Sequence, residues 1–72
     1  MDAQVMEIVV RGRLGPDLVA ALAGFSVHTD AAGRTSIVGA VTDQAKLFGL
    51  LDLFDQLHIE VISVNPVPAG AS

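Results

Sequence analysis

The chain has 72 residues, of which 51% are hydrophobic, and its eight acidic and four basic side chains give a net charge of -4. A chain of this length forms one domain that buries only about 60% of the surface its unfolded form exposes. The negative charge disfavours binding to nucleic acid or to a membrane surface, and the absence of cysteine excludes disulfides and thiolate metal sites. The N-terminus has no basic region ahead of an apolar run, and no apolar stretch approaches about 20 residues, so we expect a cytoplasmic domain. We also expect no metal and no cofactor.

The first half of the chain predicts a strand, a helix and a hairpin. Residues 5–10 are mostly β-branched or apolar and predict a strand. Residues 15–17, Gly-Pro-Asp, predict a helix start, because proline fits the first turn and an acid favours the positive end of the helix dipole. Gly24 predicts the end of that helix. Residues 25–30 and 35–41 are extended runs joined by a short glycine-containing connection, which predicts an antiparallel hairpin.

The second half predicts a longer helix and a last strand. Residues 42–43, Thr-Asp, can cap the helix. Its apolar residues fall on one face at a helical period: Leu47, Leu50, Leu51, Phe54 and Leu57. Residues 59–64 are rich in β-branched side chains and predict a strand that ends at Asn65-Pro66. We expect residues 1–66 to form a single domain and residues 67–72 to form a flexible C-terminal tail.

The order of these six segments predicts an α+β fold of the ferredoxin-like βαββαβ kind, a sandwich in which two helices cover one face of a four-stranded antiparallel sheet. The opposite sheet face is then left open, and it is the first place to look for function. Alternation along the strands places on it Val5, Glu7, Val9, Arg11, Ser26, His28, Asp30, Val38, Ala40, Ile62 and Val64. A register error of one residue would turn each of these side chains inward.

The expected open face has an apolar centre with charges around it, which is typical of an interface. A second copy of the chain is the simplest cover, so we expect a homodimer in which Val5, Val9, Val38, Ile62 and Val64 lie in the interface. Phe48 lies outside the apolar stripe of the long helix, near Asp52 and Asp55. It either contacts a protein partner or lies flat across its own helix.

The two histidines do not have the spacing of metal ligands. His28 lies in a predicted strand and is the one candidate for a catalytic residue, as a proton-transfer group. The alternative is an ordinary surface histidine, which we favour because no nucleophile or metal set accompanies it. His58 follows the long helix and is expected to interact with its negative C-terminal end.

Arg11, Arg13 and Gly15 stand just before the first predicted helix. Two cations and glycines at a helix start are typical of an anion-binding loop, so these residues are candidates for binding a small anionic metabolite. The loop contains neither the phosphate-loop Lys-Ser/Thr nor the dinucleotide glycine pattern. The glycines also serve a tight turn, which is the alternative. The layout is loosely similar to that of ACT regulatory domains, in which the turn after the first strand helps to bind amino acids.

The segment Asp43-Gln44-Ala45-Lys46-Leu47-Phe48-Gly49-Leu50-Leu51 and the strand ending Ile62-Ser63-Val64 carry a resemblance. They resemble small actinobacterial proteins of uncharacterised function whose recurring text is approximately D-Q-A-x-L-H-G-L-L, followed by a final strand L-x-S-V. This chain has Phe48 at the position of the histidine. The resemblance implies a bacterial βαββαβ domain and implies no activity.

Three functional hypotheses follow from these observations, and one of them is an acidic adaptor that docks a basic partner through Phe48, Asp43, Asp52 and Asp55. The first is a non-enzymatic interaction or regulatory module that dimerises through the open sheet face and binds a protein partner or a small metabolite. The alternative is a small dimeric α+β barrel enzyme, an isomerase or cofactor-independent monooxygenase, in which His28 moves a proton. A pocket of about 300 Å³ or more that contains His28 would favour the enzyme.

Overall fold

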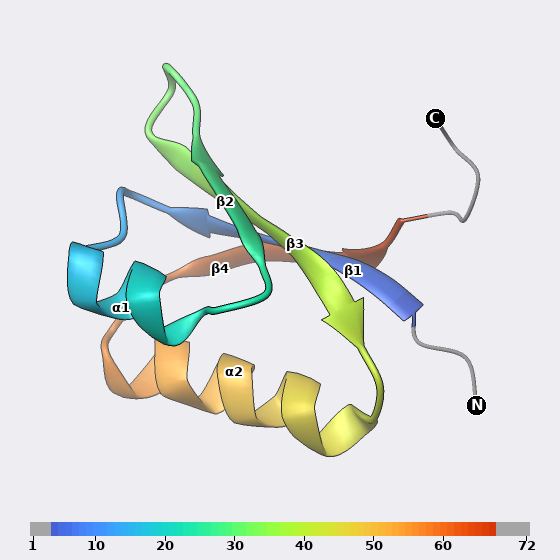
Figure 1. Cartoon of the computed structure of the whole chain (residues 1–72). Helices are drawn as coiled ribbons and strands as arrows, with labels where there is room; N and C mark the ends of the chain where they lie inside the picture. Colours follow the sequence, from blue (N-terminus) through green and yellow to red (C-terminus); the bar gives the residue numbers. More distant parts are fainter. Residues whose placement is uncertain (1–3, 68–72) are drawn as a thin grey trace.

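The computed structural model describes residues 4–67, which form a four-stranded antiparallel sheet and two helices. The elements are β1 (Gln4–Arg11), α1 (Pro16–Ala21), β2 (Ser26–Thr29), β3 (Arg34–Val41), α2 (Gln44–Gln56) and β4 (Val61–Pro66). The strand order across the sheet is β2-β3-β1-β4. Both helices lie on the same side of the sheet (Figure 1). The predicted α+β class and antiparallel sheet are confirmed, and the arrangement is compatible with a ferredoxin-like fold.

Both ends of α2 are closed by local hydrogen bonds. The carboxylate of Asp43 accepts a hydrogen bond from the backbone N–H of Lys46 at 2.8 Å, as expected for an N-cap. At the other end the N–H of His58 donates to the carbonyl of Asp55 and the N–H of Ile59 donates to the carbonyl of Phe54. This is a Schellman closure, in which one residue adopts a left-handed conformation, and here that residue is His58 with φ 59°.

The hydrogen bonds that end α2 explain why the predicted start of the last strand is wrong. The last strand was expected to begin at Ile59, whereas β4 begins at Val61. Isoleucine has a high β propensity. The backbone N–H of Ile59, however, donates to the Phe54 carbonyl at the end of α2, and its side chain packs against the core. Local closure of the helix therefore takes precedence over strand propensity.

The core lies between the helices and the two central strands. Its fully buried centre consists of Phe54 of α2 against Ile8 and Val10 of β1 and Ile37 of β3, with Leu22 closing it from the end of α1. Phe54 is the one fully buried side chain of α2, and the surrounding leucines of that helix are only partly buried. The first helix is short, so it adds few buried groups.

Phe25 lies directly on the backbone of β3. A methyl group built on Gly39 would lie within 2.8 Å of three carbons of the Phe25 ring, closer than real side chains approach. Gly39 is therefore the residue that lets the ring lie flat on the strand. The ammonium group of Lys46 is 5.6 Å from the centre of the same ring. A cation–π contact therefore connects α2 to Phe25, the residue that precedes β2.

A register shift in β4 corrects the predicted position of Val64. The pairs Val9–Ser63 and Val10–Val61 leave Ile62 as an additional residue in β4. Val64 consequently pairs with Ile8 and packs against the core, on the helix side. Strict alternation had placed Val64 on the open face, and that prediction is wrong because the bulge reverses the alternation along the strand.

The predicted C-terminal tail lies mostly outside the described residues. Its first residue, Val67, donates its N–H to the carbonyl of Val5 at 2.8 Å and so continues the pairing beside β1. Residues 68–72 are outside the part of the chain that the structure describes.

His58→Gly is expected to stabilise the protein. Glycine adopts a left-handed conformation without strain, whereas in other residues this conformation destabilises the folded state by about 1 kcal/mol. Glycine also has more conformational freedom in the unfolded state, which offsets part of this gain in stability. We expect a gain of about 0.5–1 kcal/mol, seen as a rise of a few degrees in the thermal midpoint. An unchanged or lower midpoint would show that the His58 side chain contributes more than its backbone conformation loses.

Gly39→Ala is expected to destabilise the protein by about 1–3 kcal/mol, because the added methyl group displaces the Phe25 ring. Urea unfolding measures the difference. Gly49→Ala is the matched control, since nothing lies near the added group in that exposed helical position. The control should be more stable than the wild type by about 0.5–1 kcal/mol. A Gly39→Ala variant as stable as the wild type would contradict the close packing of Phe25.

Candidate functional site

The open face of the sheet is the set of strand side chains that alternate with the buried ones and point away from the helices. Its four-strand rows follow from the pairing register. One row consists of Ser26, Val38, Glu7 and Asn65, and the next consists of His28, Ser36, Val9 and Ser63. Val5 pairs with Ala40 at one end of the face, and Arg11 pairs with Arg34 at the other.

The open face is less apolar than the sequence indicated. Val9 and Val38 are half-buried near its centre, and Val5 and Ile62 are 38% and 40% exposed. The half-buried Glu7 lies between Val38 and Asn65, so a carboxylate stands in the middle of the face. Serines occupy further central positions, and Val64 is absent because it faces the helices.

Arg11, Arg13 and Gly15 belong to a loop whose polar groups are largely used to hold the fold. The Arg11 guanidinium lies 3.1 Å from the Glu60 carboxylate, and both side chains are more than half exposed. Between the two arginines, Gly12 donates its backbone N–H to the Gly33 carbonyl at 2.6 Å. Arg13 is exposed, and Gly15 is the N-cap of the six-residue α1. Gly12 has a φ of 93° and so serves the turn, whereas Gly15 has an ordinary φ of -71°, and anion binding by Arg11, Arg13 and Gly15 stays a prediction.

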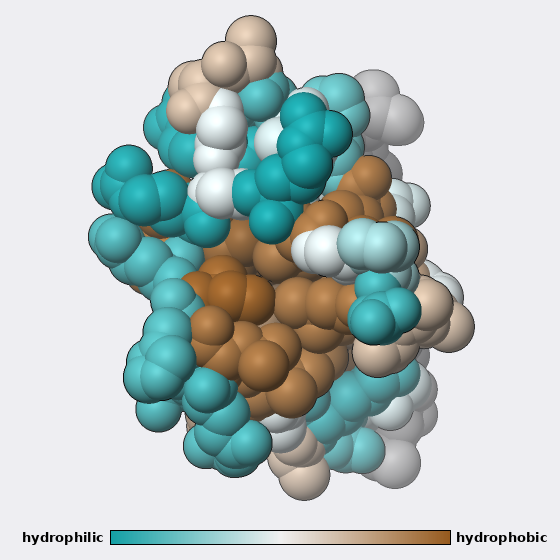
Figure 2. All heavy atoms as spheres, turned by 90° about the vertical axis from the view of Figure 1, so that its left-hand side faces the viewer, coloured by the Kyte–Doolittle hydropathy of each residue, from teal (hydrophilic) through white to brown (hydrophobic). Residues whose placement is uncertain are grey.

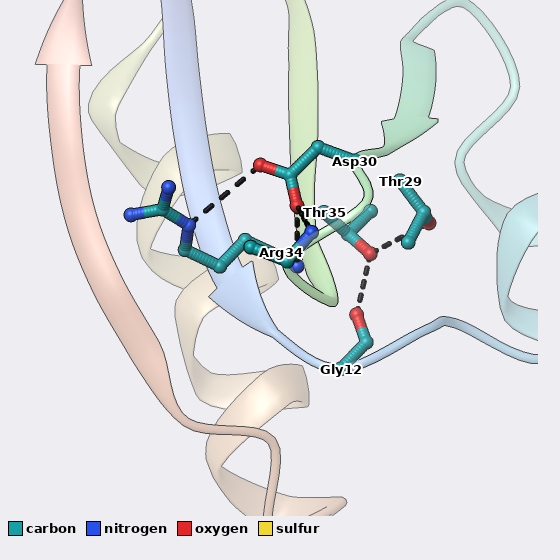
Figure 3. Close-up of polar contacts among 6 residues, drawn as sticks. Gly12, Thr29, Asp30, Arg34 and Thr35 are labelled. Carbon is teal, nitrogen blue, oxygen red and sulfur yellow. Dashed lines mark hydrogen bonds and ion pairs between the residues drawn. The ribbon is translucent and has the colours of Figure 1, made fainter.

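Asp30 organises the tip of the β2–β3 hairpin (Figure 3). Its carboxylate accepts hydrogen bonds from the backbone N–H groups of Arg34 at 3.0 Å and Ala32 at 2.9 Å, and it lies 3.7 Å from the Arg34 guanidinium. The hydrogen bond from Arg34 is the main cause of a lowered pKa of this carboxyl. Slight desolvation opposes the decrease, and the Ala32 N–H and the charges of Arg34 and His28 add to it.

Thr35 joins the hairpin to the loop that precedes α1. It is the one fully buried polar side chain in residues 4–67, and its hydroxyl bonds the carbonyl of Gly12 and lies 2.8 Å from the hydroxyl of Thr29 (Figure 3). A buried hydroxyl needs such partners, because an unsatisfied one is unfavourable. No sequence pattern predicts this junction, since threonine is common in strands for other reasons.

His28 is exposed on the short edge strand β2 and pairs with Ser36. Glu7 is two strands away, roughly 10 Å across the sheet, so the two side chains do not form an acid–base pair. Asp30 is close enough for its pKa to respond to the histidine charge. This position is that of a surface histidine, the interpretation favoured from the sequence.

A groove of about 350 Å³ lies at the opposite end of the sheet from the hairpin tip. It is lined by Gln4, Met6, Val41, Thr42, Asp43, Gln44 and Leu47. Its walls are the start of β1, the end of β3 and the first turn of α2. The groove does not include His28, and no sequence pattern predicts it, because its residues come from three separate segments.

The helical side exposes several apolar side chains, and the helical period predicted one of them, Leu57, to be buried. Figure 2 views the end that carries α1 and the C-terminal turn of α2, and apolar side chains gather in its middle with polar groups around them. Val19 of α1 is 39% exposed and Leu57, expected on the buried stripe, is 50% exposed. Phe48 is the most exposed large apolar residue at 60%, as its position off the stripe predicted.

No three histidine, aspartate or glutamate side chains of residues 4–67 lie together in a way that would hold a metal ion. None of the helices formed by these residues has the length and apolar character needed to cross a membrane.

Asp30→Asn should destabilise the protein at pH 7, because the variant loses the charged acceptor for the two backbone N–H groups. A lowered folded-state pKa means that the stabilisation is present above the usual value of 3.8 and is lost as the pH falls through the lower folded value. The difference in unfolding free energy between wild type and variant should therefore shrink as the pH falls below 3.8. Asp55→Asn, at an exposed helical site, is the control, and an equal pH dependence in both variants would contradict this role of Asp30.

Comparison with known proteins gives one match. The sequence profile described as Domain of unknown function (DUF8691) matches residues 5–65, which includes all four strands and both helices apart from the terminal residues of the sheet. No curated protein and no solved structure matches the chain. Because the match covers most of the sequence, the chain belongs to the DUF8691 family.

Proposed function

We propose that this protein is a non-enzymatic interaction module that self-associates through the open face of its sheet. The observation that carries the proposal is the one-sided cover of the sheet: both helices pack on the same face (Figure 1), and the other face presents Val5, Val9, Val38 and Ile62. Apolar side chains grouped on an uncovered sheet are typical of an interface. A second copy presents the same surface and can pair with it about a two-fold axis.

The charge distribution favours this face over the helices for self-association. Among residues 4–67, the strands and loops carry three acids and three arginines: Glu7, Asp30, Glu60, Arg11, Arg13 and Arg34. Two ion pairs neutralise four of these groups, Arg11 with Glu60 and Arg34 with Asp30. Two copies can therefore approach through the sheet without strong repulsion.

The size of the face predicts a weak dimer. Strands are about 4.8 Å apart and rise about 3.3 Å per residue, so four strands, of which the central two have eight residues, span an area of roughly 400–500 Å². Stable complexes bury about 800 Å² on each partner. We therefore expect dissociation in the micromolar range, with Glu7 further limiting the affinity because each carboxylate needs a polar group of the other copy.

We further assign the module to the ferredoxin-like group and to the bacterial cytoplasm. Support for the fold comes from the order of the elements and from the strand order β2-β3-β1-β4. Support for the compartment comes from a sequence without cysteine. The barrel-enzyme alternative needs a pocket enclosed between two sheets, and the groove of the single chain lies elsewhere and does not contain His28.

Val9→Glu and Ile62→Glu should each convert the dimer to a monomer, because a carboxylate would be buried against a second copy. Sedimentation velocity over a range of protein concentrations measures the change, and circular dichroism checks that the variants fold. Ala45→Glu is the matched control, since it adds the same charge at an exposed site on α2. The proposal fails if the wild type sediments as a monomer at high micromolar concentration, or if Ala45→Glu dissociates the dimer equally.

A further inference from the structure

The net charge of the described residues is concentrated on the helices. Both helices and their caps carry four aspartates, Asp17, Asp43, Asp52 and Asp55, against one lysine, Lys46. The strands and loops are balanced, as described above. A surface with this excess of carboxylates repels phosphates, anionic lipids and a second copy of itself, and it attracts cations.

Phe48 stands among these carboxylates on the outer side of α2. At 60% exposure it is the least covered of the large apolar side chains in residues 4–67. The helical period places Asp52 one turn and Asp55 two turns further along the same side. Residues three or four apart, such as Phe48 and Asp52, have Cβ atoms about 5–6 Å apart, so the aromatic ring and the Asp52 carboxylate can contact one ligand group together.

The cations of the protein do not neutralise this surface. The ion pairs within residues 4–67 are Arg11–Glu60 and Arg34–Asp30, and neither involves α2. The Lys46 ammonium instead lies over the Phe25 ring, at 5.6 Å from its centre. Asp52 accepts a hydrogen bond from the Gln56 side chain at 2.7 Å, a neutral donor that leaves its charge in place.

We propose that the outer face of α2, formed by Phe48, Asp52 and Asp55, docks an arginine-containing segment of another protein. A guanidinium group is planar, so it can stack on the Phe48 ring while its N–H groups donate to a carboxylate. A lysine ammonium makes the charge interaction but does not stack in this way. The site lies on the layer opposite to the open sheet face, so it stands or fails independently of self-association.

The test uses the full chain and three synthetic peptides of equal length: oligo-arginine, oligo-lysine and the uncharged oligo-citrulline. Binding is measured by titration calorimetry at low salt, because exposed charges are screened as salt is added. Oligo-arginine should bind most tightly, oligo-lysine more weakly, and oligo-citrulline not at all. Phe48→Ala should weaken arginine binding about five- to tenfold, and Phe48→Tyr should retain it.

Matched variants separate this site from general attraction to an acidic protein. Leu57→Ala removes another exposed apolar side chain of the same helical region, and Asp17→Asn removes an equal charge from α1. Both should leave the affinity within about twofold of wild type, whereas Asp52→Asn combined with Asp55→Asn should reduce it at least as much as Phe48→Ala. Amide NMR shifts on adding oligo-arginine should map to α2.

Three results would overturn the proposal. One is equal affinity for the arginine and lysine peptides together with no effect of Phe48→Ala. Another is an equal loss of affinity in Asp17→Asn and in the α2 variant, which would indicate binding by net charge alone. The third is loss of self-association in Phe48→Ala with unchanged peptide affinity, which would assign this face to a second copy of the chain.

Discussion

The insertion of Phe54 between α2 and the central strands is the contact on which the rest of the structure depends. It is the one fully buried side chain of that helix, and it meets Ile8, Val10 and Ile37. Removal of a buried phenylalanine ring typically costs about 3–5 kcal/mol. A domain of this size has a net stability of about 4–11 kcal/mol, so this single contact decides whether α2 is docked.

Local patterns were sufficient to predict the elements and their order. The Gly-Pro-Asp start of α1, the glycine-containing hairpin and the capping Asp43 each involve residues adjacent in sequence, and each is present where it was expected. Exposure of Phe48 was also predictable, because it depends only on the helical period. These features need no information about which segments meet in space.

The errors came from interactions that span several residues or segments. The additional residue Ile62 in β4 places Val64 on the helix side of the sheet. No residue type in that strand predicts a bulge. The left-handed His58 allows Ile59 to close α2, a conformation that sequence rules associate with glycine or asparagine. Leu57 is half exposed, although the helical period placed it on the buried stripe. The Thr35 junction joins segments far apart in the sequence and could not be inferred from either alone.

The bulge in β4 also determines what kinds of assembly are open to this chain. Unpaired sheet edges are templates for adding further strands, and proteins commonly limit such growth with short strands, prolines and bulges. Here one edge strand, β2, has only four residues, and the other, β4, carries both the register shift at Ile62 and the terminal Pro66. Neither edge offers a long regular strand to a neighbour, so open-ended fibre growth through the edges is disfavoured. Contact through faces remains, and a face that pairs with its own copy gives a closed assembly of limited size.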